Sequence, residues 1–189
     1  MKAARDAWRR AIPGLDAERL VFIDETRAST NMTPTRGRAP QGERLVAAVP
    51  HGHWKTTTFI GALRTDGLTA PAVFDRPVNG ESFLAYVEQN LVQTLRPGDV
   101  VVMDNLGSHK VAGVAEAIER AGCLLTYLPP YSPDFNPIEN LFSKFKRRLR
   151  RIGARTVRAL WRAVGDCLDS FAPDECRNDF RHCGYWTLK

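Results

Sequence analysis

Three acidic side chains are the candidates for chemistry in this sequence: Asp24, Asp104 and Glu139. Asp24 and Asp104 each come at the end of a short apolar run, residues 20–26 (LVFIDET) and residues 99–105 (DVVVMDN). Such runs are typical of buried strands, whose carboxyl ends often border a cleft. Three converging carboxylates repel one another unless a cation neutralises them, and their oxygens suit Mg²⁺ or Mn²⁺. We therefore predict a site for two divalent ions, an arrangement suited to phosphodiester chemistry.

Both Asp24 and Glu139 also have a plainer interpretation. Glu139 lies in the first turn of a predicted helix, residues 137–151, with Asn136 at the N-cap and Pro137 at the first helical position. In such a helix start the Glu side chain can bond back to the backbone N–H of Asn136 as part of a capping box. The same geometry fixes where the Glu points, so capping and metal binding both stay open. Asp24 alone could be an ordinary turn residue after a strand.

The predicted helix continues into a strongly basic segment. The chain has a formal net charge of +6, and every charged residue between positions 144 and 158 is basic. A helix face without acids cannot neutralise itself through i,i+4 pairs, so we favour contact with phosphates over a solvated face. The candidate DNA-contacting residues on this helix are Lys144, Lys146, Arg147, Arg150 and Arg151.

The composition excludes several other classes of protein. A length of 189 residues, with 43% hydrophobic and 25% charged residues, suits one globular domain. No apolar run approaches the roughly 20 residues of a membrane span, and the N-terminal segment MKAARDAWRR lacks the apolar core of a signal peptide. The 4 cysteines form no CxxC pair, which favours free thiols in a reducing cytoplasm. We expect no membrane partner.

The order of the predicted elements indicates an α/β fold. These elements are a lead-in helix over 3–19 interrupted at Pro13, strands at 20–26, 45–50 and 55–63 with a polar loop at 27–42, a helix at 79–95, a strand at 99–105, a helix at 111–121, a strand at 123–129, helices at 137–151 and 156–171, and a short tail with Trp186. The first three strands would form an antiparallel meander. The later strand–helix–strand run predicts parallel strands joined by a right-handed crossover.

Four sequence blocks resemble the catalytic domain of the mariner-superfamily transposases, on their bacterial insertion-sequence branch (the insertion sequence 630 family). The blocks are VFIDET, TRGRAPQGERL, VVMDNLGSHK and LPPYSPDFNPIENLFSKFKRRL, in the family's order between residues 21 and 149. The interval from Asp104 to Glu139 also fits the superfamily's catalytic triad. The resemblance implies a ribonuclease-H-like fold over residues 20–189, a mixed five-stranded sheet flanked by helices, with residues 1–19 as lead-in. It implies Asp24, Asp104 and Glu139 as catalytic ligands of two Mg²⁺ or Mn²⁺ ions.

The same resemblance implies a reaction and its partners. The chain would nick transposon ends, and the freed 3′-hydroxyl would attack target DNA, typically at a TA dinucleotide. Asn105 and His109 would contact substrate or support the metal ligands, although turn and helix-cap roles stay open. Arg36 and Arg38 would join the basic helix as phosphate contacts. We expect a homodimer on paired DNA ends, working at the nucleoid in a bacterial cytoplasm.

Two further hypotheses stay open. Family members carry an N-terminal helix-turn-helix region, and the residues before Asp24 are too few for one. We therefore expect that region to be encoded separately, or the chain to be a truncated, non-catalytic remnant whose DNA binding survives loss of the acids. A ribonuclease-H-like nuclease with a cellular role is the other hypothesis, and it would hydrolyse DNA without ever joining it.

Overall fold

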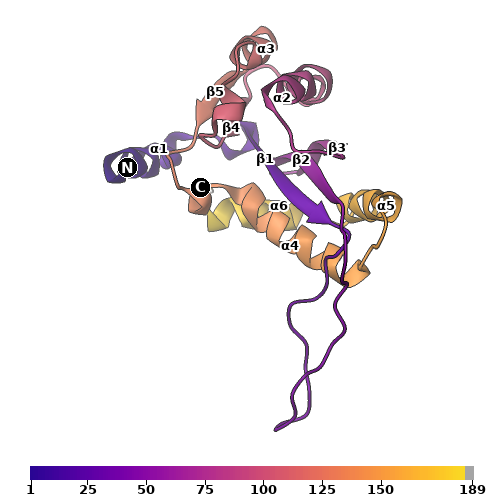
Figure 1. Ribbon diagram of the computed structural model, residues 1–189. Helices are drawn as coiled ribbons and strands as arrows, with labels where there is room; N and C mark the ends of the chain where they lie inside the picture. Colours follow the sequence, from indigo (N-terminus) through magenta and orange to yellow (C-terminus); the bar gives the residue numbers. More distant parts are fainter. Residues whose placement is uncertain (186–189) are drawn as a thin grey trace.

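A mixed five-stranded sheet lies at the centre of the protein (Figure 1). The structure is a computed structural model, and it describes residues 1–185. The strands are β1 (Leu20–Ser29), β2 (Thr56–Arg64), β3 (Gly67–Phe74), β4 (Val100–Met103) and β5 (Leu124–Tyr127), in the order β3-β2-β1-β4-β5. β1, β2 and β3 pair antiparallel, and β4 and β5 continue the sheet in parallel from β1. The predicted sheet of three antiparallel and two parallel strands is confirmed.

Two of the strands differ from the prediction. Residues 45–50 are not a strand, because they lie in an excursion between β1 and β2 where Val46 is 84% exposed and no neighbouring strand covers it. Figure 1 shows this excursion projecting away from the body, past the end of α4 (Pro137–Ile152). The third antiparallel strand is instead β3, at the edge of the sheet. An edge strand tolerates the exposed Pro71, which masked the strand signal in the sequence.

Asp24 lies in the middle of β1, not at its end as predicted. The parallel pairing of β1 with β4 stops at Ile23 opposite Met103, but the antiparallel pairing with β2 continues past Asp24, which faces Gly61, as far as Ser29. β1 is therefore longer than its apolar run, because β2 supplies hydrogen-bond partners for the polar half. Asp24 still lies level with the end of β4, which is the property that matters for meeting Asp104.

Helices cover both faces of the sheet (Figure 1). α4, α5 (Val157–Leu168) and α6 (Pro173–His182) pack on one face against a core that includes Phe22 and Phe59. α2 (Gly80–Tyr86) and α3 (Val114–Arg120) cover the other face, which includes Val21 and Ile23. Because neighbouring residues of β1 point to opposite faces, a continuous apolar run is what a doubly covered strand requires.

The remaining helices are short, apart from the N-terminal one. α1 spans Lys2–Ala11 and ends before Pro13, as expected for the lead-in segment. Single-turn helices cover Ile12–Gly14, Ala17–Arg19, Gly107–Lys110 and Pro133–Phe135, and α2 continues through Val87–Leu91 and Val92–Thr94. Among the described residues no helix combines the length and apolarity needed to cross a membrane.

The C-terminal segment was wrongly predicted as a tail. α6 begins with Pro173 and has Asp174 and Glu175 in its first turn, which are the usual signals of a helix start. Its buried side chains, among them Cys176 and Phe180, are few, so the apolar periodicity was too short to indicate a helix. Trp186 lies outside the described residues.

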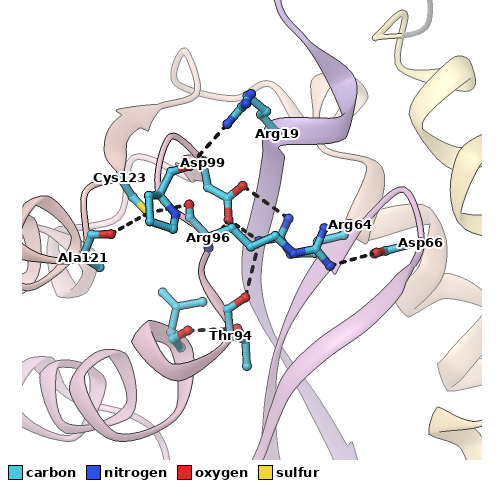
Figure 2. Close-up of polar contacts among 10 residues, drawn as sticks. Arg19, Arg64, Asp66, Thr94, Arg96, Asp99, Ala121 and Cys123 are labelled. Atoms are coloured by element: carbon cyan, nitrogen blue, oxygen red, sulfur yellow. Dashed lines mark hydrogen bonds and ion pairs between the residues drawn. The ribbon is translucent and has the colours of Figure 1, made fainter.

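A buried ion pair fastens the end of the sheet opposite Asp24 (Figure 2). Arg64, the last residue of β2, pairs with Asp99, just before β4, and both side chains are almost fully buried. Asp99 also accepts a hydrogen bond of 2.7 Å from the backbone N–H of Arg96. A buried charge needs such partners, so this pair fixes the approach to β4 relative to β2.

Candidate active site

One cavity brings the three predicted acids together. It has a volume of about 440 Å³ and is lined by Asp24 from β1, Asp104 from the end of β4 and Glu139 from the first turn of α4. The rest of its wall comes mainly from the loop between β5 and α4. β1 and β4 are neighbours in the sheet, and α4 packs across β1, so the topology explains why residues far apart in sequence meet here.

Asp24 is the most buried of the three acids, with 7% of its surface exposed. Its Oδ1 accepts the backbone N–H of Glu25 at 2.7 Å, and its Oδ2 accepts a hydrogen bond of 2.8 Å from Asn136 Nδ2. Burial, reinforced by the charges of Glu139 and Asp104, raises the pKa of Asp24 to about 7. The ionised carboxylate is thus disfavoured in the protein alone and would be favoured by a nearby cation.

Asn136 occupies the N-cap position of α4 without a capping side-chain bond, and its backbone N–H donates to the Pro133 carbonyl at 3.0 Å, so the predicted capping box with Glu139 is not formed. Among the residues that the structure describes, no side chain caps this helix, and the Asn136 amide reaches Asp24 instead. Pro137 lacks an N–H, and the backbone N–H of Glu139 donates to the Asn136 carbonyl at 3.1 Å. The Glu139 side chain is therefore available to the cavity that it lines. Asn136 is a site residue that the sequence did not single out, because its local pattern indicated a cap.

His109 contacts Asp104 without lining the cavity itself. Its Nδ1 lies 2.6 Å from Asp104 Oδ1, although the N–H is not aligned as in a good hydrogen bond. Burial alone would lower the pKa of His109, but the contact with Asp104 and the charges of Asp104, Glu25 and Asp24 outweigh it and raise the pKa. The ring also stacks on Phe83, with centroids 4.3 Å apart. Asn105 lines the cavity beside Asp104.

The three carboxylates have the chemistry of a divalent-cation site. Within residues 1–185 no group of three or more His, Cys, Asp or Glu side chains has the spacing of a ready-made metal cage. The donor set nevertheless fits Mg²⁺ or Mn²⁺, because carboxylate oxygens suit these ions, and a bound cation would offset the burial and the neighbouring acids that raise the pKa of Asp24. Mg²⁺ usually takes only one or two carboxylates and keeps water or phosphate as its other ligands.

Basic side chains gather where the excursion leaves the body. One cleft of about 550 Å³ has four arginines, Arg36 from the excursion and Arg147, Arg150 and Arg151 from α4. A neighbouring cleft is lined by Lys146 and Arg150 together with Arg27 from β1, a residue that the sequence did not single out. No acidic side chain of the described chain lines either cleft. These residues, Arg27, Arg36, Lys146, Arg147, Arg150 and Arg151, are called the basic cluster below.

Two of the predicted phosphate contacts lie elsewhere. The Lys144 ammonium faces α6, with Asp179 at 2.9 Å and Glu175 at 3.2 Å. Its charge is already balanced there, which the sequence could not indicate because α6 was not predicted. Arg38 is exposed on the excursion and lines neither basic cleft.

The sheet order, with Asp24 on the central strand β1 and Asp104 just after the neighbouring β4, is that of a ribonuclease-H-like fold. Residues 19–160 match the family model of the DDE superfamily endonucleases, and the chain belongs to this family. A search of curated protein sequences gave no match.

Solved structures of Mos1 transposase share the fold. The Mos1 strand transfer complex superposes with a TM-score of 0.75 at 16% sequence identity, covering 96% of this chain and 56% of the Mos1 chain. The mariner Mos1 paired end complex with Mg gives 0.75 at 16% identity, covering 96% and 57%. The catalytic domain of Mos1 mariner transposase gives 0.69 at 14% identity, covering 96% and 85%. The chain therefore spans a little over half of the longer Mos1 chains.

Proposed function

We propose that this chain is the catalytic domain of a transposase that cuts and joins DNA strands with the help of divalent cations. The observation that carries the proposal is the convergence of Asp24, Asp104 and Glu139 on one cavity from three separate elements. Membership of the DDE superfamily endonucleases supports it, as does the common fold with the Mos1 catalytic domain. The sequence blocks further support a place in the bacterial insertion sequence 630 branch.

Each side chain of the cavity has a role in this proposal. Asp24, Asp104 and Glu139 would hold two Mg²⁺ or Mn²⁺ ions. When bound, such ions supply an activated attacking oxygen and stabilise the leaving oxygen of an in-line displacement. Asn136 would orient Asp24 through its 2.8 Å hydrogen bond, and His109 would position Asp104 through their 2.6 Å contact. Neither residue needs to touch the DNA for this role.

The basic cluster would bind the DNA backbone beside the cavity. Arg150 and Arg151 follow Glu139 by about three turns of α4, which is roughly 17 Å along the helix axis. A DNA duplex that contacts both places would therefore extend along α4 over several base pairs. Arg38 could reach DNA from the excursion, whereas Lys144 is left out because it pairs with α6.

The larger assembly is part of the same proposal. We propose a catalytic domain over residues 20–189 with residues 1–19 as its lead-in, acting on transposon ends and target DNA as a homodimer. A separately encoded helix-turn-helix region would recognise the ends. The Mos1 structures that share the fold include a strand transfer complex and a paired-end complex with a transposon end, which supports DNA as partner.

A plasmid assay tests the proposal. The purified chain is incubated with supercoiled plasmid and a duplex oligonucleotide that has a free 3′-hydroxyl, in Mn²⁺ or Mg²⁺. We expect nicking and covalent joining for the wild type, and loss of both in Asp24→Asn, Asp104→Asn and Glu139→Gln. Asp166→Asn, an exposed acid of α5 outside the cavity, is the matched control and should retain activity.

Three outcomes would count against this function. Full activity in all three variants would remove the acids from the reaction. Salt-sensitive DNA binding without any cutting would favour the non-catalytic remnant. Hydrolysis that is never accompanied by joining would favour the nuclease.

A further inference from the structure

Tyr131 is an unusual residue in the wall of the carboxylate cavity. It lines the cavity together with the three acids, yet it is 86% exposed. Its backbone has φ of +55°, a left-handed conformation that is strained for a residue other than glycine or asparagine. Strained residues of this kind persist where the surrounding structure enforces them, and they cluster at ligand clamps and active sites.

The lead-in helix α1 holds the backbone around Tyr131. Arg5 Nη1 donates to the Tyr131 carbonyl at 3.2 Å and to Ser132 Oγ at 2.9 Å. The same guanidinium makes two hydrogen bonds to Asp134, of 2.8 and 2.7 Å, and lies over the Phe135 ring. Prolines at 129, 130 and 133 restrict the loop further. The loop is therefore rigid at the point where Tyr131 projects.

A second contact fixes the same loop from the C-terminal side. Tyr185 donates a hydrogen bond of 2.6 Å to the Phe135 carbonyl and accepts one of 2.9 Å from Trp8 Nε1. The Tyr131 side chain takes no part in these contacts: in the part of the chain that the structure describes, its ring stacks on no other ring or cation, and its hydroxyl makes no hydrogen bond. The fold thus anchors the Tyr131 backbone and leaves the ring open to an incoming ligand.

We propose that Tyr131 is a stacking platform for an unpaired nucleobase next to the phosphate that enters the carboxylate cavity. An exposed aromatic ring beside a cation-dependent phosphate site matches how proteins bind single-stranded nucleic acid, because every base has a face that can stack. A ring on a rigid loop loses little conformational freedom when it binds. This inference rests on the proposed function and adds to it that the DNA strand is unstacked beside the reacting phosphate.

Fluorescence of 2-aminopurine tests the platform without requiring any cutting. Forked DNA carries one 2-aminopurine at successive positions around the junction of single and double strand, and binding is measured in Ca²⁺. We expect one position to be quenched by the wild type and by Tyr131→Phe, which retains the ring. Tyr131→Leu, which retains apolar bulk without an aromatic face, should lose the quenching and bind the fork roughly 5- to 150-fold more weakly.

Tyr131→Gly separates loss of stacking from loss of folding. Glycine accepts a positive φ without strain, so this variant should melt at a higher temperature than the wild type and still fail to quench the probe. If Tyr131→Leu quenches every probe position as the wild type does, or binds the fork equally tightly, the stacking role is wrong and the ring faces another kind of partner. If the wild type quenches the probe but neither nicks nor joins DNA, the stacking role of Tyr131 stands and only the transposase proposal is refuted.

Discussion

At the scale of single residues, Asp24 shows how the fold buries and orients a carboxylate. Its carboxylate is buried, close to two other acids, and oriented by Asn136 and by the backbone of Glu25. These contacts fix the position of the oxygens but do not neutralise them. The residue therefore contributes geometry to the site and costs stability whenever it is ionised without a cation.

Replacing Asp24 by asparagine should change how stability depends on pH. The pKa of Asp24 is raised from 3.8 to about 7 in the folded protein. The stability that protonated Asp24 contributes to the folded state is therefore fully present below pH 3.8 and is lost as pH rises towards 7. In EDTA, Asp24→Asn should unfold like the wild type at pH 4 and be more stable at pH 8, by roughly 2 to 4 kcal/mol. The Asn136 amide can turn its unpartnered Oδ1 toward the new side chain.

Urea titrations at intervals between pH 4 and pH 8 measure this difference. Asp166→Asn, whose side chain is exposed, should follow the wild type throughout. Parallel stability curves for the wild type and Asp24→Asn would contradict the uncompensated charge that the site requires.

At the scale of elements, α4 presents three kinds of side chain along one helix. Its first turn carries Glu139, its buried side docks on the sheet, and its last turns carry the arginines of the basic cluster. The buried residues are Pro137, Ile138, Leu141, Phe142, Phe145 and Leu149. The polar side is itself divided, because Lys144 faces the acids of α6.

Neutralising the end of α4 should weaken DNA binding and its dependence on salt. Changing Arg147, Arg150 and Arg151 together to glutamine is expected to reduce the slope of log affinity against log salt by roughly 0.7 to 0.9 for each phosphate that the variant no longer neutralises. Lys144→Gln is the matched control: it should leave that slope unchanged, because the ammonium pairs with Asp179. Fluorescence anisotropy over a salt series measures both. An equal change in the two variants would mean that Lys144 also binds phosphate.

The lead-in helix α1 should stabilise the cavity wall through Arg5. Removing its four hydrogen bonds to the loop in Arg5→Ala should speed amide hydrogen exchange at Phe135 and Asn136. Arg10→Ala is the control, because Arg10 is exposed on the same helix and makes no ion pair with any described residue. Unchanged exchange in Arg5→Ala would show that the prolines alone hold the loop.

At the scale of the whole molecule, the two ends of the sheet have different tasks. One end gathers the carboxylates, whose mutual repulsion opposes folding, and the other carries the buried pair of Arg64 and Asp99 (Figure 2). The pair joins β2 to the approach of β4, the strand that delivers Asp104. The pair therefore stabilises the sheet at the end that lies away from the cavity.

Breaking this pair should cost stability without changing the site. Arg64→Met leaves Asp99 buried without its charged partner, and we expect the free energy of unfolding to fall by about 3 to 5 kcal/mol. Because the change is distant from the cavity, the folded variant should still bind Mn²⁺ like the wild type. Urea denaturation and Mn²⁺ titration measure the two quantities. A decrease smaller than about 1 kcal/mol would show that water replaces the pair.

The sequence by itself indicated the candidate acids of this protein and the outline of its fold. Apolar runs predicted the neighbouring strands β1 and β4, and the positions of Asp24 and Asp104 relative to these runs singled out both acids, because these signals are local. The basic end of α4 was also visible, since runs of like charge need no partner to be recognised.

Only the tertiary structure decided which partners those local signals meet. Residues 45–50 have the composition of a strand but pair with no neighbouring strand. β3, in contrast, forms the edge strand of the sheet although it contains Pro71. Asn136 has the pattern of a helix cap and binds Asp24 instead, at a separation of 112 residues. Lys144 pairs with an unpredicted helix. In each case the deciding free energy comes from burial and pairing with a distant segment, and a local pattern contains no information about that segment.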